Sequence, residues 1–85
     1  MYVVGVSESI RRSLKKLPRK LQERLLAAAY GSAENPRPVG AAKLTGVDLY
    51  RIRVGDYRIV YRIDDDERRV QITIIAHRRE VYRGL

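Results

Sequence analysis

Residues 50–66, YRIRVGDYRIVYRIDDD, constrain the fold more than any other stretch, because apolar and basic residues alternate in them on both sides of a Gly-Asp pair. A period of two is typical of a strand with one buried face, and Gly55-Asp56 has the composition of a tight hairpin turn. With a two-residue loop, the register sets Val54 opposite Tyr57, Arg53 opposite Arg58, and Arg51 opposite Val60. The stretch therefore predicts an antiparallel hairpin with arginines on one face.

The rest of the chain predicts a strand, two helices and one further strand. Residues 2–6 are apolar and β-branched, and Ser7 follows as a helix N-cap. Apolar residues recur at helical spacing from Ser7 to Leu17 and again from Pro18 to Tyr30, which predicts a helical hairpin followed by a loop over residues 31–39. We expect strands at about residues 48–54, 57–63 and 69–76, the last two joined by an acidic turn at residues 64–67.

This order, β-α-α-β-β-β, predicts an α+β fold with a single domain over residues 1–85. The tight turns favour an antiparallel sheet, with a three-stranded meander after the helices and both helices on one face. The opposite face then carries Arg51, Arg53, Arg58 and Arg62. Facing Leu14, Leu21 and Leu25 of the helices we expect Tyr50, Ile52, Val54, Tyr57, Ile59, Tyr61, Ile63, Val70, Ile72 and Ile74. The segment from His77 to Leu85 is compatible with a short C-terminal helix or with an extended tail.

Composition narrows the classes of function. Eighteen Lys and Arg residues against ten Asp and Glu residues give a net charge of +8, which favours a polyanionic partner, although a generically basic surface also serves solubility. The chain has no cysteine and one histidine, so no disulfide and no usual metal site is expected. The longest apolar runs are too short for a membrane span, and no signal peptide is recognised, so we expect a cytoplasmic protein.

Arg53 opposite Arg58 is an unfavourable pair, because like charges facing each other across strands cost up to about 1 kcal/mol. Solvent can screen this repulsion, or an anion can lie between the two guanidinium groups, each of which can grip two phosphate oxygens. Arginines on exposed strands also keep a sheet edge soluble, so both interpretations stand. His77 could transfer a proton or simply end a strand, and Tyr82 could stack on a base or pack on the sheet.

AKLTG (42–46), LYRIRVGDYRIVYRIDDD (49–66) and HRREVYR (77–83) together resemble the RelE/ParE superfamily of toxin–antitoxin toxins, and its RelE branch in particular. The resemblance covers nearly the whole chain. It implies a metal-free and cofactor-free endoribonuclease, an mRNA interferase, that cuts mRNA in the ribosomal A site. It also implies a cognate antitoxin, which we expect to be acidic and to form a hetero-oligomer with this chain.

The resemblance also implies site residues. Arg51 and Arg53, Arg58, Arg78 and Tyr82 match the family's cleavage site, and we add RNA contacts at Lys43, Arg62 and Arg79. Some members carry lysine at the second-strand positions, and a lysine can lose its proton there, whereas an arginine hardly can. The general base is therefore open, and His77 is one candidate for it.

Two other functions remain open beside the nuclease. The ParE-like branch has the same fold and inhibits DNA gyrase by binding it, without cleaving RNA. A toxin homologue that binds RNA or the ribosome without catalysis is the other alternative, since arginine in place of lysine keeps the charge and removes a possible base. The arginine face with Arg78 and Tyr82 favours the nuclease.

Overall fold

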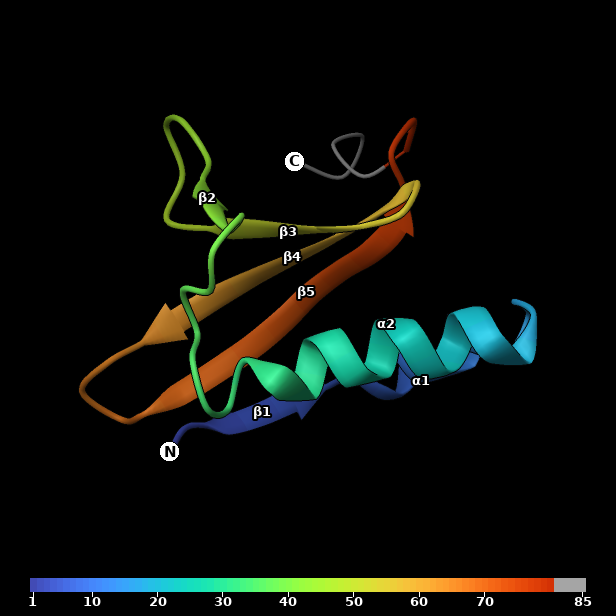
Figure 1. Cartoon of the computed structure of the whole chain (residues 1–85). Helices are drawn as coiled ribbons and strands as arrows, with labels where there is room; N and C mark the ends of the chain where they lie inside the picture. Colours follow the sequence, from blue (N-terminus) through green and yellow to red (C-terminus); the bar gives the residue numbers. More distant parts are fainter. Residues whose placement is uncertain (81–85) are drawn as a thin grey trace.

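A computed structural model describes residues 1–80 and shows one five-stranded sheet with two helices on one of its faces (Figure 1). The strand order is β1-β5-β4-β3-β2. The elements in chain order are β1 (Val3–Val6), α1 (Glu8–Leu14), α2 (Arg19–Gly31), β2 (Ala42–Lys43), β3 (Tyr50–Val54), β4 (Tyr57–Asp64) and β5 (Arg69–His77). This confirms the α+β class and the antiparallel meander of β3, β4 and β5.

The expectation of a wholly antiparallel sheet is wrong at one edge, because β1 pairs with β5 in parallel, from Val3 opposite Arg69 to Val6 opposite Ile72. Parallel neighbours need a long crossover connection. Here the two helices and the strands β2 to β4 supply it, and they return the chain to β5 beside its own beginning. No local pattern in the sequence reports this pairing partner.

The strand β2 was not expected. Ala42 and Lys43 pair with Arg51 and Tyr50 at the other edge of the sheet, and the turn after them is closed by a hydrogen bond from the Leu44 N–H to the Leu49 carbonyl. A strand of two residues has no period to detect. It forms because β3 offers its free edge to a segment that returns within a few residues.

The helices begin as predicted, but α1 is shorter than expected. Ser7 caps α1, with its Oγ accepting a hydrogen bond from the Ile10 N–H at 3.3 Å. The regular helix ends at Leu14 and not at Leu17, because Pro18 disfavours helical geometry at the residue before it and the last turn tightens, with the Leu17 N–H bonded to the Leu14 carbonyl. Among residues 1–80, neither helix is long and apolar enough to cross a membrane.

The core lies between the helices and the sheet. Its centre is formed by the fully buried Leu25, Ala29, Ile59 and Tyr61, with Leu14, Ile63, Val70 and Ile72 around them. Tyr50, Ile52, Val54 and Tyr57 pack against this cluster, as the alternation in residues 50–66 predicts. The arginines between them consequently lie on the face away from the helices.

A β-bulge in β5 overturns one core assignment. Tyr61 pairs with Ile72 and Val60 pairs with Ile74, so Thr73 is an extra residue, and its Oγ1 donates to the Val60 carbonyl at 2.9 Å. Ile74, expected against the helices, therefore lies on the opposite face with Val60. Beyond the bulge, Ile75 faces the helices in its place.

Candidate functional site

The candidate site begins with the hairpin of β3 and β4. The register sets Arg53 opposite Arg58 and Arg51 opposite Val60, as the sequence predicts for a two-residue turn. Arg53 is exposed, and Arg51 and Arg58 are partly buried. Two guanidinium groups thus project from directly paired positions on the face that no helix covers.

Arg58 and Arg78 are both attached to the turn of this hairpin. Nη1 of Arg58 donates to the main-chain carbonyls of Gly55 and Tyr57, at 3.1 and 3.0 Å. The Arg78 N–H donates to the Asp56 carbonyl at 2.7 Å, just after the end of β5. The turn therefore brings an arginine of β4 and one that follows β5 to the same end of the sheet.

A small apolar cluster lies on this same face, which the sequence did not predict. Leu49 and Val60 are 6% and 0% exposed, and Leu44, Ile74 and Ala76 pack against them. Arg51 lies across from Val60, and its Nε atom is buried without a hydrogen-bond partner in the described part of the chain, residues 1–80. The face therefore has an apolar centre bordered by arginines. The sequence contained one sign of this centre, because Val60 lies between Arg58 and Arg62 in the alternation of β4.

The remaining residues that the sequence predicted for the site do not lie in a single element, and they are found on β4, on β2 and after β5. Arg62 is exposed on β4 opposite Gln71, Arg78 and Arg79 are exposed, and Lys43 on β2 lies 3.9 Å from Asp48. Residues 78–80 form a turn, while Tyr82 and the rest of the possible C-terminal helix lie outside the described residues.

His77 lies on the helix side of the sheet. Its ring meets that of Tyr57 edge-on, with centroids 5.6 Å apart, and both line a pocket of about 330 Å³ with Leu14 of α1 and with Leu17, which follows that helix. Strand alternation thus separates it from Arg78, its neighbour in sequence. No three His, Asp or Glu side chains in residues 1–80 gather as a metal site would require.

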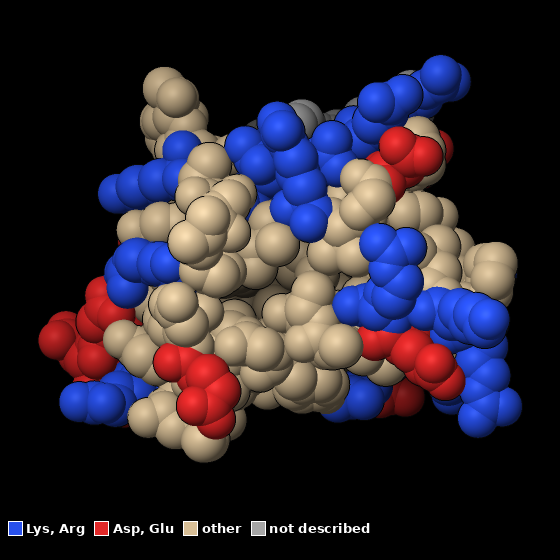
Figure 2. Space-filling view, in the orientation of Figure 1, with Lys and Arg blue, Asp and Glu red and all other residues tan. Residues whose placement is uncertain are grey.

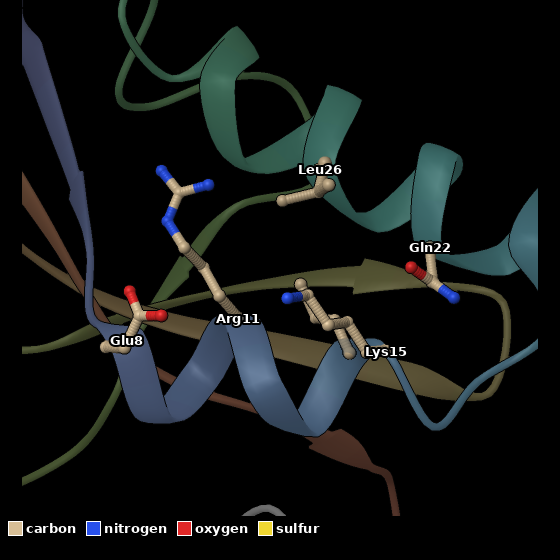
Figure 3. Close-up of a pocket in the computed structure, with 6 residues that line it drawn as sticks. Glu8, Arg11, Lys15, Gln22 and Leu26 are labelled. Atoms are coloured by element: carbon tan, nitrogen blue, oxygen red, sulfur yellow. The ribbon is translucent and has the colours of Figure 1, made fainter.

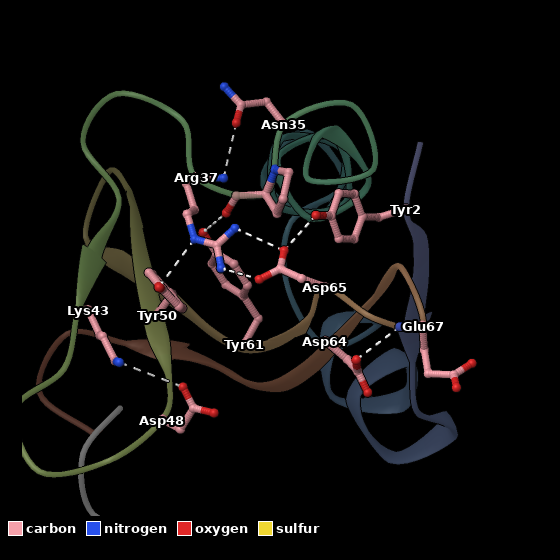
Figure 4. A network of polar contacts seen from close by, with 11 residues as sticks. Tyr2, Asn35, Arg37, Lys43, Asp48, Tyr50, Tyr61, Asp64, Asp65 and Glu67 are labelled. Atoms are coloured by element: carbon pink, nitrogen blue, oxygen red, sulfur yellow. Dashed lines mark hydrogen bonds and ion pairs between the residues drawn. The ribbon is translucent and has the colours of Figure 1, made fainter.

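A polar network ties the loop after α2 to the sheet, at the opposite end of β4 from the turn (Figure 4). The Arg37 guanidinium forms two hydrogen bonds with the Asp65 carboxylate, at 2.8 and 3.2 Å, and donates from Nε to the Tyr50 hydroxyl. Tyr2 also donates to Asp65, and Tyr61 donates to the Pro36 carbonyl at 2.6 Å. Nothing in the pattern of this loop predicted the network.

The network changes the titration of its members. Hydrogen bonds from Arg37 and Tyr2 lower the pKa of Asp65 to about 2, because they favour the charged carboxylate. Burial raises the pKa of Tyr61 to about 12. The hydrogen bond to Asp65 likewise raises the pKa of Tyr2. All three groups are therefore held in their ordinary neutral-pH protonation states, and the network has a structural role.

A further pocket, of about 210 Å³, lies between α1 and α2 (Figure 3). Leu14 and Leu26 contribute apolar walls, and Glu8, Arg11, Lys15 and Gln22 line the remainder. Arg11 extends toward α2, where its Nη2 donates to the Tyr30 hydroxyl at 2.6 Å. Its mixed charges favour no class of ligand, so we assign it no role.

Comparison with known proteins gives a consistent result. The sequence profile of a family described as "ParE toxin of type II toxin-antitoxin system, parDE" matches residues 4–82. The toxin RelE of Mycobacterium tuberculosis is 36% identical over 84 residues, which cover 96% of this chain and 87% of the relative. The toxin RelG of the same organism is 35% identical over 86 residues, which cover 96% of this chain and 97% of the relative.

Solved structures agree. The toxin–antitoxin complex RelBE2 of M. tuberculosis matches with a TM-score of 0.76 and 29% identity, over 89% of this chain and 96% of the other. The RelE–RelB complex of Pyrococcus horikoshii matches with a TM-score of 0.76 and 28% identity, over 91% of this chain and 94% of the other. Isolated E. coli RelE matches with a TM-score of 0.74 and 26% identity, over 91% of this chain and 84% of the other. With the profile and both relatives spanning nearly its whole length, this chain belongs to the RelE/ParE superfamily of type II toxin–antitoxin toxins and is of the RelE type.

Proposed function

We propose that this toxin is an mRNA interferase, an endoribonuclease that cleaves mRNA in the A site of the ribosome. The single observation that carries the proposal is Arg53 directly opposite Arg58 on the helix-free face. Two cationic side chains on directly paired strand positions are unfavourable alone and become favourable around a phosphate. The names of the relatives, RelE and RelG, support the same activity. The site of action would be the cytoplasm, where mRNA is translated.

The reaction requires an in-line attack within the RNA. The 2′-oxygen bonds to the adjacent phosphorus, the bond from phosphorus to the 5′-oxygen breaks, and a proton leaves the 2′-hydroxyl while another reaches the 5′-oxygen. The products are a 2′,3′-cyclic phosphate and a free 5′-hydroxyl. Arg51, Arg53 and Arg58 would stabilise the extra negative charge of the phosphorane. Arg78 would contact the leaving oxygen, and Tyr82 would orient a base.

Proton transfer has no strong candidate among the described side chains of this face. His77 lies on the helix side beside Tyr57, so we give it no part in the reaction. Arginine is a poor base, because it keeps its proton at physiological pH. Alignment of the message can supply about 7–11 kcal/mol of the barrier. We therefore propose that the ribosome, by aligning the RNA, supplies much of the rate enhancement.

The test is induced expression followed by mapping of mRNA 5′ ends. Wild-type toxin should produce cuts within translated codons, and Arg53→Ala or Arg58→Ala should abolish them. Arg19→Ala is a suitable control, because that side chain is 90% exposed on α2 and its one ion pair among residues 1–80 is to Glu23, at 3.6 Å. Intact messages at toxic levels of the wild-type protein would refute the nuclease. Two alternatives would then remain, binding to RNA or the ribosome without cleavage, and inhibition of gyrase.

A ParE-like gyrase inhibitor is the second candidate, favoured by the description of the matching family profile. It predicts growth arrest with intact mRNA and altered DNA supercoiling. The same induced cultures decide between the two functions, because plasmid topology and 5′ ends can be measured on one sample.

We also propose that an acidic antitoxin holds the toxin inactive. The similar solved structures include RelE-type toxins in complex with RelB antitoxins. The net charge of +8 gives a long-range attraction to an acidic segment. A protein encoded next to the toxin should copurify with it and restore growth on coexpression, and failure on both counts would reject this partner.

A further inference from the structure

We propose that the Gly55-Asp56 turn is a positioning element, which sets the orientation of Arg58 and Arg78 through its main-chain carbonyls. The consequence for RNA rests on the proposed function, whereas the positioning itself can be measured on the toxin alone. The turn donates no side chain to a substrate. It acts through the two arginines that it holds.

The contacts of Arg58 determine which edge of its guanidinium is available. An arginine side chain has five N–H donors, two of them on each Nη and one on Nε. Nη1 of Arg58 bonds to the carbonyls of Gly55 and Tyr57, at 3.1 and 3.0 Å, so both of its hydrogens have acceptors. The edge formed by Nε and Nη2 has no hydrogen-bond partner among residues 1–80 and is available to a ligand. That edge can make two parallel bonds to phosphate oxygens.

Arg78 is aligned to the same turn. The last pair between β4 and β5 joins Tyr57 to His77, and the bond from the Arg78 N–H to the Asp56 carbonyl extends the pairing by one residue, at 2.7 Å. Arg53 is the direct partner of Arg58 across the hairpin. A single two-residue turn therefore orients arginines from three segments of the chain.

The turn can hold this geometry because Gly55 adopts φ +58°. Glycine at the first central position is typical of the hairpin turn that requires a positive φ there. A Cβ at Gly55 would lie 3.7 and 3.9 Å from the guanidinium nitrogens of Arg24, which is ordinary contact. Space therefore does not exclude alanine. The backbone conformation opposes L-alanine and suits D-alanine.

This difference gives a test with matched variants. The full 85-residue chain is made by chemical synthesis as wild type, as Gly55→Ala with L-alanine, as the same substitution with D-alanine, and as Gly40→Ala. Gly40 is the control, because its φ is +93° and a Cβ there meets nothing within 4 Å. The Gly40→Ala substitution likewise places an L-residue at a positive φ, but outside the turn that holds Arg58 and Arg78.

Two measurements follow the positioning. Nuclear magnetic resonance reports hindered rotation of the Arg58 Nη groups and protection of the Arg78 amide, and titration with inorganic phosphate reports the affinity of the cluster. Loss of a charge-assisted contact should weaken phosphate binding about tenfold in the L-alanine chain. We expect wild-type signals and affinity, within about twofold, in the D-alanine chain and in Gly40→Ala.

Three results would overturn the proposal: wild-type phosphate affinity in the L-alanine chain, failure of D-alanine to restore it, or an equal loss in Gly40→Ala. On programmed ribosomes, the L-alanine chain should lower kcat and leave KM unchanged, because it alters orientation and not docking. A wild-type chain that cleaves nothing there would reject the proposed function. The resonance and phosphate measurements would still decide whether the turn positions the arginines.

Discussion

The Nε atom of Arg51 is buried opposite Val60, and none of residues 1–80 gives it a hydrogen-bond acceptor. A buried N–H that lacks an acceptor costs about 1–3 kcal/mol relative to one that is satisfied. The ligand-free face therefore contains a donor that an oxygen in the right place would stabilise. Phosphate oxygens could provide such an acceptor once the side chain moves out, and a hydroxyl at position 60 could provide it within the protein.

Val60→Thr tests this environment against Val70→Thr, because both valines are buried, at 0% and 1% exposure, and only Val60 faces Arg51. A hydroxyl without a partner at position 70 should lower the free energy of unfolding by about 1–3 kcal/mol. At position 60 the loss should be about 1 kcal/mol smaller, since the hydroxyl accepts from Nε. Urea denaturation measures both. Equal losses would mean that Arg51 gains nothing from the acceptor.

Asp65 gives a prediction for pH. Its pKa in the folded chain is about 2, below the ordinary 3.8, so the network stabilises the fold above pH 4 and this contribution is lost as the pH falls toward 2. Asp65→Asn should therefore be less stable than wild type at neutral pH, and the difference should shrink steadily between about pH 4 and 2. Denaturation at a series of pH values measures it.

Asp66→Asn is the matched control, because the adjacent Asp66 makes no ion pair or side-chain hydrogen bond among residues 1–80. Its stability should follow that of wild type over the same pH range. A constant difference between Asp65→Asn and wild type down to pH 2 would show that the charge of Asp65 does not carry the effect.

At the scale of elements, the bulge in β5 decides which side chains reach which face. Thr73 is the extra residue, so its removal should leave Ile72 paired with Tyr61 and Ile74 paired with Val60. The main loss is the bond from Thr73 to the Val60 carbonyl, and the free energy of unfolding should fall by about 1 kcal/mol.

Removal of Gln71 provides the contrast, because it is equally exposed on β5 but belongs to the regular ladder opposite Arg62. Without it, either Val70 or Ile72 must leave the core, at a cost of about 1.5–3 kcal/mol or more. Thermal or urea denaturation of the two deletion variants should rank them in this order. A deletion of Thr73 as damaging as that of Gln71 would mean that the bulge is required for more than register.

The hairpin could be predicted from sequence because its information is local. A two-residue turn and a strict period of two leave one register, and the structure has it from Val54 opposite Tyr57 to Arg51 opposite Val60. The bulge could not be predicted, because the apolar run from Ile72 to Ala76 suits either phase of a strand. The parallel pairing of β1 and the bond from Arg37 to Asp65 were missed for a related reason, since they join segments far apart in sequence.

Two groups of basic side chains matter at the scale of the whole molecule, and others, such as Arg68 and Arg69 at the β4–β5 turn, lie outside them. Figure 2 shows Lys and Arg side chains along the upper edge of the view, toward β3 and the β3–β4 turn, and again around the ends of the two helices. On α1 and just after it, Arg12, Lys15 and Lys16 are exposed. The helix α1 itself packs on the side of the sheet away from the hairpin arginines. Under the proposed function, one group would attract RNA at long range and the other would contact the phosphate that reacts.

This division predicts separable effects on binding and on cleavage. Association with ribosomes should weaken as salt rises, because contacts to RNA phosphates release counterions. The double variant Arg12→Glu and Lys16→Glu should reduce both the affinity and its salt dependence, and leave the cleavage rate of bound toxin unchanged. Arg53→Ala should instead lower that rate by about 10²-fold or more with a smaller change in affinity.

Single-turnover cleavage on programmed ribosomes at several salt concentrations separates the two quantities, since saturating ribosomes report the rate and the half-saturation point reports the affinity. Arg12, Lys16 and Arg53 are all exposed, so the charge-reversal variant and Arg53→Ala should both keep the stability of the wild type within about 0.5 kcal/mol. If the α1 variant lowered the rate at saturation, the helix would have to influence the phosphate directly. Because α1 packs on the other side of the sheet from the hairpin arginines, we expect no such effect, and observing one would contradict the assignment of the two charged groups.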